Sequence, residues 1–421
     1  MQLQVGTHMK LLKHTITFLV FGLSFICGAS TASAATLEVL ASGLENPRQI
    51  TFGPDGALYV AEAGTGGSGP VIAGPELGVS LRFGTTGAVT RVDGNNQTRV
   101  VSGLPSLALT PQGTTPTLNV GDQLSSVGPH DLGFDRRGNA YVLLGYASTA
   151  FQKELLGPEG TDVGRLLSYN VGSNGTWTRN TDFSIDLLAN RALYNPYIDG
   201  DYLNNPYDLE IVNEQFVIAD PGGNNYFTAD LTGNVVLQSR FSPFSVNGVM
   251  VESVPTSITL GPDGAYYVGE FTGAPYPERG ARVYRVPPSG EPEVYASDFT
   301  QITGLDFDSE GNLYVLEYSV NSTNDPNAEL LGSITKIAPD GTRKILVSPS
   351  EGLIAPNGLT VGPDGAIYVS NRSTILGQGE VVRVKSSATV PEPSFTAGLL
   401  VLGTLGTGLL LKRKVQTETV V

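Results

Sequence analysis

The chain has 421 residues, with 40 acidic side chains against 25 basic ones and a formal net charge of −15. So acidic a protein repels nucleic acids and anionic membrane surfaces, which excludes nucleic acid as an expected partner. Its single cysteine, Cys27, lies near the N-terminus, and of its three histidines only His130 lies beyond residue 14, so neither a disulfide framework nor a multi-histidine zinc site is expected.

Residues 1–34 have the pattern of a secretory signal peptide. Two lysines precede an apolar run at 15–27, and an Ala-Ser-Ala site of the kind that signal peptidase cleaves ends at Ala34. We therefore expect export, with signal peptidase as a processing partner and residue 35 as the start of the mature chain. Because both lysines lie after Met9, translation starts either at Met1 or at Met9.

One sequence motif recurs six times between residues 35 and 385: a short apolar strand, a turn, and a second strand with an aromatic residue. Three copies have the turn Gly-Pro-Asp-Gly, starting at Gly53, Gly261 and Gly362, and degenerate copies lie at 137–142, 214–218 and 310–315. Proline presets φ and the last glycine adopts a positive φ, so each copy predicts a hairpin. Further strands follow, and four strands make one propeller blade. We predict an all-β fold, a six-bladed β-propeller.

The two ends of the repeat region complement each other. The last copy ends at Val384 without a fourth strand, whereas the folded region begins with the strand-like segment Leu37–Leu40. We predict that this N-terminal strand completes the last blade, which removes an open sheet edge. The first two units also carry long insertions, at 65–86 and around 185–203, which lie either on a functional face or in tolerated surface loops.

Acidic side chains recur three residues after an anchor in the second strand of four units: Glu62, Asp220, Glu270 and Glu317. Equivalent positions of a propeller lie on one ring, so these carboxylates are candidates for a metal site. Ca²⁺ is the expected cation, since it prefers several oxygen ligands. In the alternative reading, each carboxylate accepts backbone N–H groups of its own blade and binds no metal.

Polar residues gather at the start of the second and third units. His130 and Asp131 follow Gly-Pro at the beginning of the second blade, where the strands of a propeller face the central channel. The other ligand-binding candidates are Asn204, Asn205, Tyr207, Asp208, Asp220, Asn224, Asn225 and Asn357. These residues form either the polar lip of a cleft or elaborate loop structure, and His130 is either functional or structural. The aromatic, proline-rich loop 270–277 is a further candidate to cover the channel mouth, and no catalytic residue is identified.

Residues 386–421 have the pattern of a sorting signal. The linker 386–394 contains Pro391-Glu392-Pro393, residues 395–414 combine an apolar run with a basic cluster, and residues 415–421 form a tail. The apolar run is just long enough for a transmembrane helix, and basic residues stay on the cytoplasmic side. This order resembles a PEP-CTERM signal, which implies recognition and cleavage by an exosortase; the alternative is a plain membrane anchor. We expect the protein in the periplasm, the outer envelope or the medium.

Several segments resemble the ScyD/ScyE family of NHL-type propellers. They are Gly43–Arg48, Gly103–Ser106, Asn205–Tyr207, Ala219–Asn224, Pro255–Ser257 and Tyr276-Pro277. The resemblance covers residues 37–385 and implies a secreted cyanobacterial propeller associated with biosynthesis of the sunscreen pigment scytonemin. The sequence departs from the family at 194–197, where relatives carry Asn-Pro-Asp.

Two classes of function remain open at this point. In the first, an exported accessory protein binds a small molecule, a glycan or a protein partner, with the link to scytonemin-type pigment biosynthesis that the resemblance implies. In the second, the propeller is an enzyme of the lactonase, lyase or quinoprotein type that acts on an aromatic or sugar-like substrate in the central channel. The shortage of histidines favours the first class.

Overall fold

The computed structural model describes residues 35–74, 79–111, 121–172, 175–197, 204–325 and 327–385. The expected signal peptide, the Pro391–Pro393 motif and the expected transmembrane helix at 395–414 lie outside these residues. In the part of the chain that is described, no helix is both long and apolar enough to cross a membrane. The described residues belong to one compact unit.

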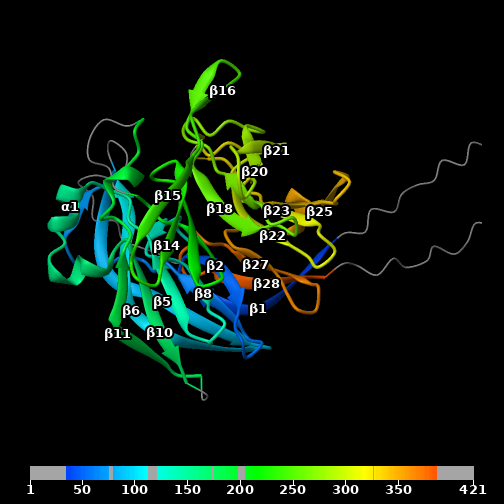
Figure 1. The fold of residues 1–421 in the computed structure, drawn as a ribbon. Coiled ribbons are helices and arrows are strands. Elements are labelled where there is room, and N and C mark those ends of the chain that lie inside the picture. Colours follow the sequence, from blue (N-terminus) through cyan, green and yellow to red (C-terminus); the bar gives the residue numbers. More distant parts are fainter. Residues whose placement is uncertain are drawn as a thin grey trace, which may run out of the picture. The chain divides into compact units, whose positions relative to one another are not determined.

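Six antiparallel sheets of four or more strands account for most of the described residues (Figure 1). The first sheet contains β2 (Pro47–Phe52), β3 (Leu58–Glu62), β4 (Val71–Ala73), β5 (Val79–Asp93), β6 (Asn96–Pro111) and β7 (Ser126–Val127). The second contains β8 (Pro129–Phe134), β9 (Ala140–Leu144), β10 (Arg165–Val171) and β11 (Trp177–Asp186). The third contains β12 (Asp208–Val212), β13 (Gln215–Asp220), β14 (Asn225–Asp230) and β15 (Val235–Arg240).

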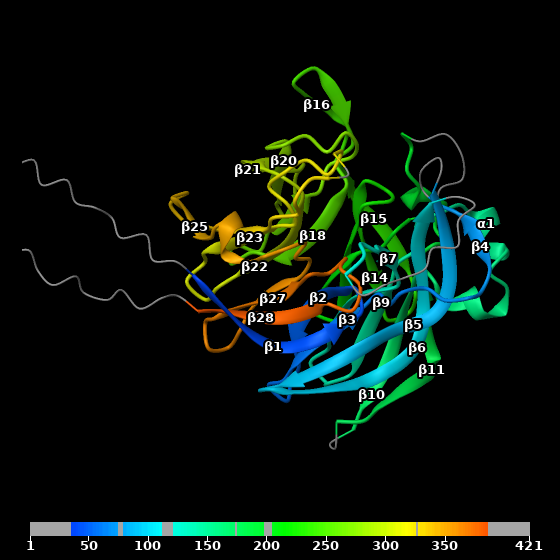
Figure 2. The same cartoon turned by 180° about the vertical axis from the view of Figure 1, so that it is seen from behind.

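The other three sheets lie in the second half of the chain. The fourth contains β18 (Pro255–Leu260), β19 (Tyr266–Glu270), β20 (Ala281–Val286) and β21 (Glu293–Phe299). The fifth contains β22 (Ile302–Phe307), β23 (Leu313–Glu317), β24 (Ser333–Ile337) and β25 (Arg343–Val347). The sixth contains β26 (Leu359–Val361), β27 (Ile367–Asn371), β28 (Gly379–Lys385) and the N-terminal strand β1 (Thr36–Leu44). A separate hairpin, β16 (Phe244–Val246) with β17 (Val249–Val251), stands away from these sheets in Figures 1 and 2.

The six sheets close into a ring. The innermost strand of each sheet contacts the innermost strand of the next, in the order β2, β8, β12, β18, β22, β26, and β26 contacts β2. This cyclic order confirms the predicted β-propeller architecture.

The N-terminal strand completes the sixth sheet, as predicted. β1 pairs antiparallel with β28, with Leu37 opposite Val384 and Val39 opposite Val382. The two strands lie side by side in Figure 2, where β1 is blue and β28 orange. Chain segments from opposite ends of the fold therefore share one set of ladder hydrogen bonds, and β1 covers the edge that β28 would otherwise leave open.

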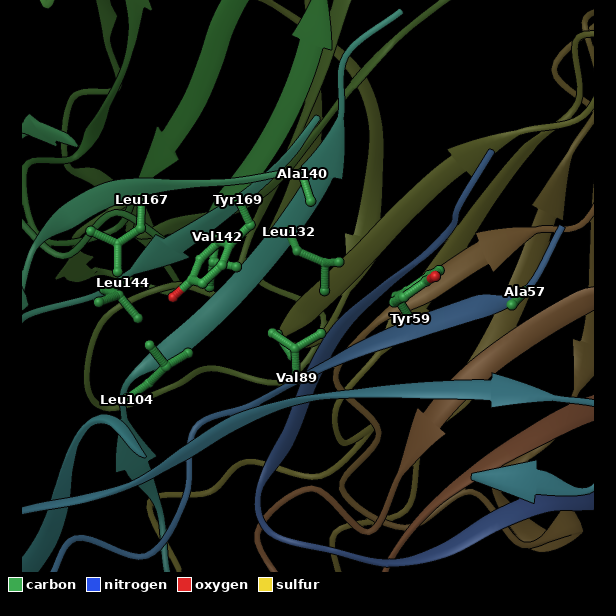
Figure 3. Close-up of a cluster of buried hydrophobic side chains, with 11 residues drawn as sticks. Ala57, Tyr59, Val89, Leu104, Leu132, Ala140, Val142, Leu144, Leu167 and Tyr169 are labelled. Carbon is green, nitrogen blue, oxygen red and sulfur yellow. The ribbon is translucent and has the colours of Figure 1, made fainter. Parts of the chain in front are cut away.

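The hydrophobic core lies between neighbouring sheets. Figure 3 shows the cluster between the first and second sheets, where Tyr59 of β3 and Val89 of β5 face Leu132 of β8 and Val142 of β9. Each of these four side chains is nearly inaccessible to solvent. Burial of such surfaces stabilises the ring by roughly 25 cal/mol for each Å² of apolar area.

The repeated turn is held by its own side chains. Asp55 accepts a hydrogen bond from the backbone N–H of Ala57 at 3.2 Å and another from the Tyr59 hydroxyl at 3.1 Å. Gly56 has φ of +77°, a conformation that side chains disfavour. The turns at Asp263 and Asp364 have the same bonds to Tyr267 and Tyr368. This contact explains why aspartate in the turn and tyrosine in the next strand recur together.

The long insertions of the first two units pack against each other. β5 and β6 extend to 15 and 16 residues, and their buried Leu81 and Leu107 contact Tyr146 and Leu156 of the second unit. The second insertion contains helix α1 (Ala150–Glu154) and short 3-10 helices at Pro158–Asp162 and Arg191–Leu193. Much of it therefore lies before β10, earlier than the predicted stretch around 185–203, because the third strand of this unit follows the insertion.

Candidate functional site

The innermost strands form a closed cycle, so the residues at or just before their starts lie around one end of the channel, and this ring is the basis of the candidate site. Its members, here called the mouth ring, are Arg48, His130, Tyr207, Thr256, Thr303 and Asn357. A proline precedes every member except Thr303, consistent with the tolerance of proline at the first position of a strand. In the sheets of Arg48, His130, Thr256 and Thr303 the strand register shifts at this point. Such bulges redirect side chains, here toward the channel mouth.

A cleft lies over the mouth ring. Two cavities of about 560 and 470 Å³ share Arg48, Asn205, Tyr207, Phe271 and Tyr276 in their walls, so we treat them as one cleft. The wall is largely apolar; its apolar members include Leu109, Val127, Met250, Val254, Phe271 and Tyr276. A concave, mostly apolar space with a few convergent polar groups is the usual form of a small-molecule site.

A hydrogen-bonded group of three side chains closes the base of the cleft. Arg48 Nη1 donates to the Tyr207 hydroxyl at 3.0 Å, and Tyr207 donates to Asn357 Oδ1 at 3.0 Å. Asn357 Nδ2 lies 2.8 Å from the same hydroxyl. These residues come from the first, third and sixth sheets, so the tyrosine extends across the channel mouth and is held from two sides.

His130 lies beside this group in a fixed orientation. Its Nδ1 is 3.0 Å from the carbonyl oxygen of Pro206, and since a carbonyl only accepts, Nδ1 carries the proton. The ring lies 4.7 Å from the Tyr207 ring. A Cβ on Gly145 would lie 2.2 Å from His130 Cε1, so only glycine leaves room for the imidazole.

Burial sets the charge of His130. Desolvation, and after it the nearby Arg48 guanidinium, lower the pKa of His130 to about 3. The imidazole is therefore neutral at ordinary pH, and Nε2 is a hydrogen-bond acceptor. No described residue makes a hydrogen bond to Nε2.

Several polar atoms of the cleft wall have no partner among the described residues. Arg48 Nε, Ser126 Oγ and Thr272 Oγ1 are buried and make no hydrogen bond. Unsatisfied buried polar groups cost about 1–3 kcal/mol each. Because these atoms have almost no solvent-accessible surface, an occupant of the cleft reaches them only if the wall shifts.

The channel below the mouth ring contains a separate acidic cavity of about 250 Å³. Asp131 and Asp208 accept hydrogen bonds from backbone N–H groups of the next sheet, at 2.7 Å from Leu209 and from Ile258 respectively. Burial, and then the adjacent Asp208, raise the pKa of Asp131 well above its usual value, and burial also raises that of Asp208. These two predicted site residues therefore link sheets in the channel wall and do not line the cleft.

Two further carboxyls line the same cavity. Asp306 accepts a hydrogen bond from Val361 N at 2.8 Å, and its pKa is raised to about 6, mainly by burial. Burial, followed by the charges of Asp306 and Asp208, raises the pKa of Glu210 to about 8. The channel thus contains carboxyl groups that retain protons above the usual range of pH.

The ten predicted ligand-binding residues fall into three groups. His130, Asn205, Tyr207 and Asn357 line the cleft. Asp131 and Asp208 lie in the channel. Asn204, Asp220, Asn224 and Asn225 lie behind the cleft wall and hold loops by hydrogen bonds, for example from Asn205 N to Asp220 at 2.8 Å and from Asn225 to the Leu193 carbonyl at 2.8 Å.

The structure does not bring the four predicted metal ligands together. Glu62 binds Arg99 and the backbone N–H of Glu45, and Glu270 binds Arg282 at 2.8 Å. Glu317 accepts from Thr300 N and Ser333, and Asp220 accepts from Asn205 N and Gly223 N. Among the described residues no group of three or more His, Cys, Asp or Glu side chains could hold a metal ion. Glu62, Glu270 and Glu317 are held by neighbouring groups, whereas Asp220 Oδ2 is buried and makes no hydrogen bond to a described residue.

Sequence reasoning missed part of the cleft. Arg48 and Glu252 were not predicted, although Arg48 lies five residues before Gly53, as Thr256 lies before Gly261 and Asn357 before Gly362. The proline before most mouth-ring residues, at a constant distance from the turn, is the signal that would have located them. The loop 270–277, a weaker candidate, does contribute Phe271 and Tyr276 to the wall.

The chain matches no known family profile and no curated protein. Solved structures with a similar fold include a streptogramin B lyase, at 14% identity and TM-score 0.43, over 83% of this chain and 97% of that one. A carbohydrate-active enzyme of family AA12 from Trichoderma reesei has 14% identity and TM-score 0.47, over 85% and 96%. A PQQ-bound aldose sugar dehydrogenase from Streptomyces coelicolor has 11% identity and TM-score 0.46, over 84% and 98%. These neighbours are β-propellers, and at such identities the likeness concerns the fold and not the activity.

Proposed function

We propose that the protein is an exported, non-catalytic propeller of the cell envelope that binds a small organic molecule in the cleft over the mouth ring. The observation that carries this proposal is the pairing of an apolar, partly aromatic wall with polar side chains at its base. Phe271 and Tyr276 supply ring surfaces, and the Arg48 guanidinium and His130 Nε2 supply hydrogen-bonding groups. A ligand with an apolar body and a polar end satisfies both.

The electrostatics of His130 favour binding over catalysis. A general base works best when its pKa lies near the working pH, and the pKa of His130 is about 3. Tyr207 is already engaged by Arg48 and Asn357, so its hydroxyl is not free to transfer a proton. The neutral imidazole is better suited to accept a hydrogen bond from a ligand than to remove a proton.

The second candidate is an enzyme that acts on an aromatic or sugar-like substrate. One feature favours it: the bond from Nδ1 to the Pro206 carbonyl fixes the tautomer and leaves Nε2 with its lone pair. An anionic substrate beside the ring would raise the pKa of His130 and make it a stronger base. In this candidate His130 removes a proton and Arg48 stabilises the resulting negative charge.

The cellular setting is part of the proposal. The signal-peptide pattern, the Pro391-Glu392-Pro393 motif and the basic cluster support export followed by processing by an exosortase. The resemblance to the ScyD/ScyE family supports a role beside extracytoplasmic pigment biosynthesis. Two of its segments, ending at Arg48 and at Tyr207, contribute side chains to the cleft.

Ligand-observed NMR with a library of small organic fragments tests this function. We expect several fragments to bind the wild type and to lose binding in Ala147→Trp, because Ala147 lines the cleft and a large side chain would fill it. The matched control is Ala189→Trp, which places the same side chain in a different cavity. Fragments that bind all three proteins equally, or a library without binders, would contradict a small-molecule site in the cleft.

A further inference from the structure

Among the described residues, the Arg48 guanidinium lacks the carboxylate partner that two other arginines have. Arg282 and Arg99 pair with the buried carboxylates Glu270 and Glu62, at 2.8 and 2.7 Å. Arg48 is only 6% exposed, and no carboxylate among the described residues lies within ion-pair distance of it. Burying a charge without a counter-charge is costly, and no described residue compensates the charge of Arg48.

The hydrogen-bond partners of Arg48 among the described residues are all neutral. Nη1 donates to the Tyr207 hydroxyl, and Nη2 donates to the Ser126 carbonyl at 2.5 Å, with the Ser125 hydroxyl 3.4 Å away. Nε has no partner. Guanidinium groups bind carboxylates through pairs of N–H donors, and the hydrogen bonds to described residues leave part of the donor capacity of Arg48 unused.

The carboxylates in the described part of the cleft wall lie beyond ion-pair distance of Arg48. Glu252 lines the wall, but its Oε1 accepts from Asn195 and Asn224, at 3.1 and 3.3 Å. Asp325 lines the neighbouring part of the cleft. Neither reaches Arg48, and His130 is neutral.

We infer that the ligand of the cleft is an organic carboxylate, whose carboxyl group binds the Arg48 guanidinium and whose apolar ring packs against Phe271 and Tyr276. This inference rests on the proposed small-molecule function and adds the chemical class of the ligand. The combined cavities of about 560 and 470 Å³ are large enough for a molecule with at least one aromatic ring.

Matched acids and amides test the charge preference. Isothermal titration at pH 7 compares phenylacetate, 4-hydroxyphenylacetate and 4-hydroxybenzoate with their primary amides, which have nearly the same shape and no charge. We expect the acids to bind about tenfold or more tightly, the effect of a charge-assisted hydrogen bond. Arg48→Gln should abolish this preference and leave amide binding unchanged, whereas Arg48→Lys should retain part of it.

Arg136→Gln is the control for net charge, because Arg136 is exposed and lies outside the cleft, where it donates to Asn213. It should keep the wild-type preference, and circular dichroism checks that each variant is folded. Equal binding of acids and amides by the wild type would overturn the inference and leave the small-molecule function standing. Absence of binding by every compound would count against both. The wild-type comparison decides the question even if Arg48→Gln does not fold.

Discussion

The channel carboxyl Glu210 should make the protein less stable as pH rises, and replacing it with glutamine should remove that effect. Its pKa in the folded protein is about 8, raised from 4.5 mainly by burial. When folding raises the pKa of a group, its contribution to the free energy of unfolding is fully present at pH values below the pKa of the unfolded state. That contribution is lost as pH rises through the pKa of the folded state. The loss for Glu210 therefore falls between about pH 4.5 and pH 8.

The size of the effect follows from the width of that interval. Each pH unit between the two pKa values is worth about 1.4 kcal/mol, so the change from pH 5 to pH 8 removes at most about 4 kcal/mol. Glu210 is partly open to the channel cavity, and water there screens the charge. We expect about 2 kcal/mol, roughly half of that limit.

Urea unfolding followed by circular dichroism at pH 5 and pH 8 measures this difference. Glu210→Gln should have nearly the stability of the wild type at pH 5 and exceed it at pH 8. Comparing the two proteins at each pH cancels the effect of every other titrating group. One of these is His130, whose pKa is lowered in the folded protein, so its titration reduces stability as pH falls below about 6.5. The exposed Glu214 provides the control, Glu214→Gln, which should follow the wild type. If the curves of Glu210→Gln and the wild type stay parallel from pH 5 to pH 8, the reasoning is refuted.

Three further predictions concern closure, packing and metal. Deleting residues 35–42 removes most of the strand that completes the sixth sheet and should lower the melting temperature by about 10 °C or more, whereas an unchanged value would contradict closure by this strand. Gly145→Ala should cost about 1–3 kcal/mol and shift the His130 NMR signals, because the new Cβ would overlap the imidazole; unshifted signals would show that the ring is not confined there. Glu270→Gln should destabilise the protein by about 2–4 kcal/mol, because it leaves Arg282 without its partner. Neither Ca²⁺ nor a chelator should change the melting temperature of the wild type or the variant. A calcium-dependent rise in the wild type alone would support a metal site.

The propeller could be predicted from the sequence because its signal is local and repeated. The Asp55–Tyr59 contact lies within one hairpin, so each copy of the turn carries its own explanation. The closing strand was also predictable, since a sixth unit without a fourth strand must find one elsewhere. The position of the second insertion was less predictable. The repeated turn sequence does not show whether an insertion comes before or after the third strand of its unit.

The cleft could be predicted only in part, because its residues are held by contacts between sheets. Tyr207 and Asn357 belong to different sheets, and only the closed ring brings them within 2.8 Å. The members of the mouth ring differ in side-chain chemistry, so their repeat is hard to see in the sequence. The acidic residues such as Glu62 repeat visibly, and they do not line the cleft. The bulge that turns Arg48 toward the mouth depends on strand pairing, which the sequence does not display.

A crystal structure of the protein soaked with the tightest-binding aromatic acid tests the central claim most directly. The account predicts density for the ligand in the cleft, with a carboxylate oxygen about 2.7–2.9 Å from a nitrogen of Arg48 and the ring against Phe271. Ligand density at another surface, or a carboxylate turned away from Arg48 toward solvent, would contradict it.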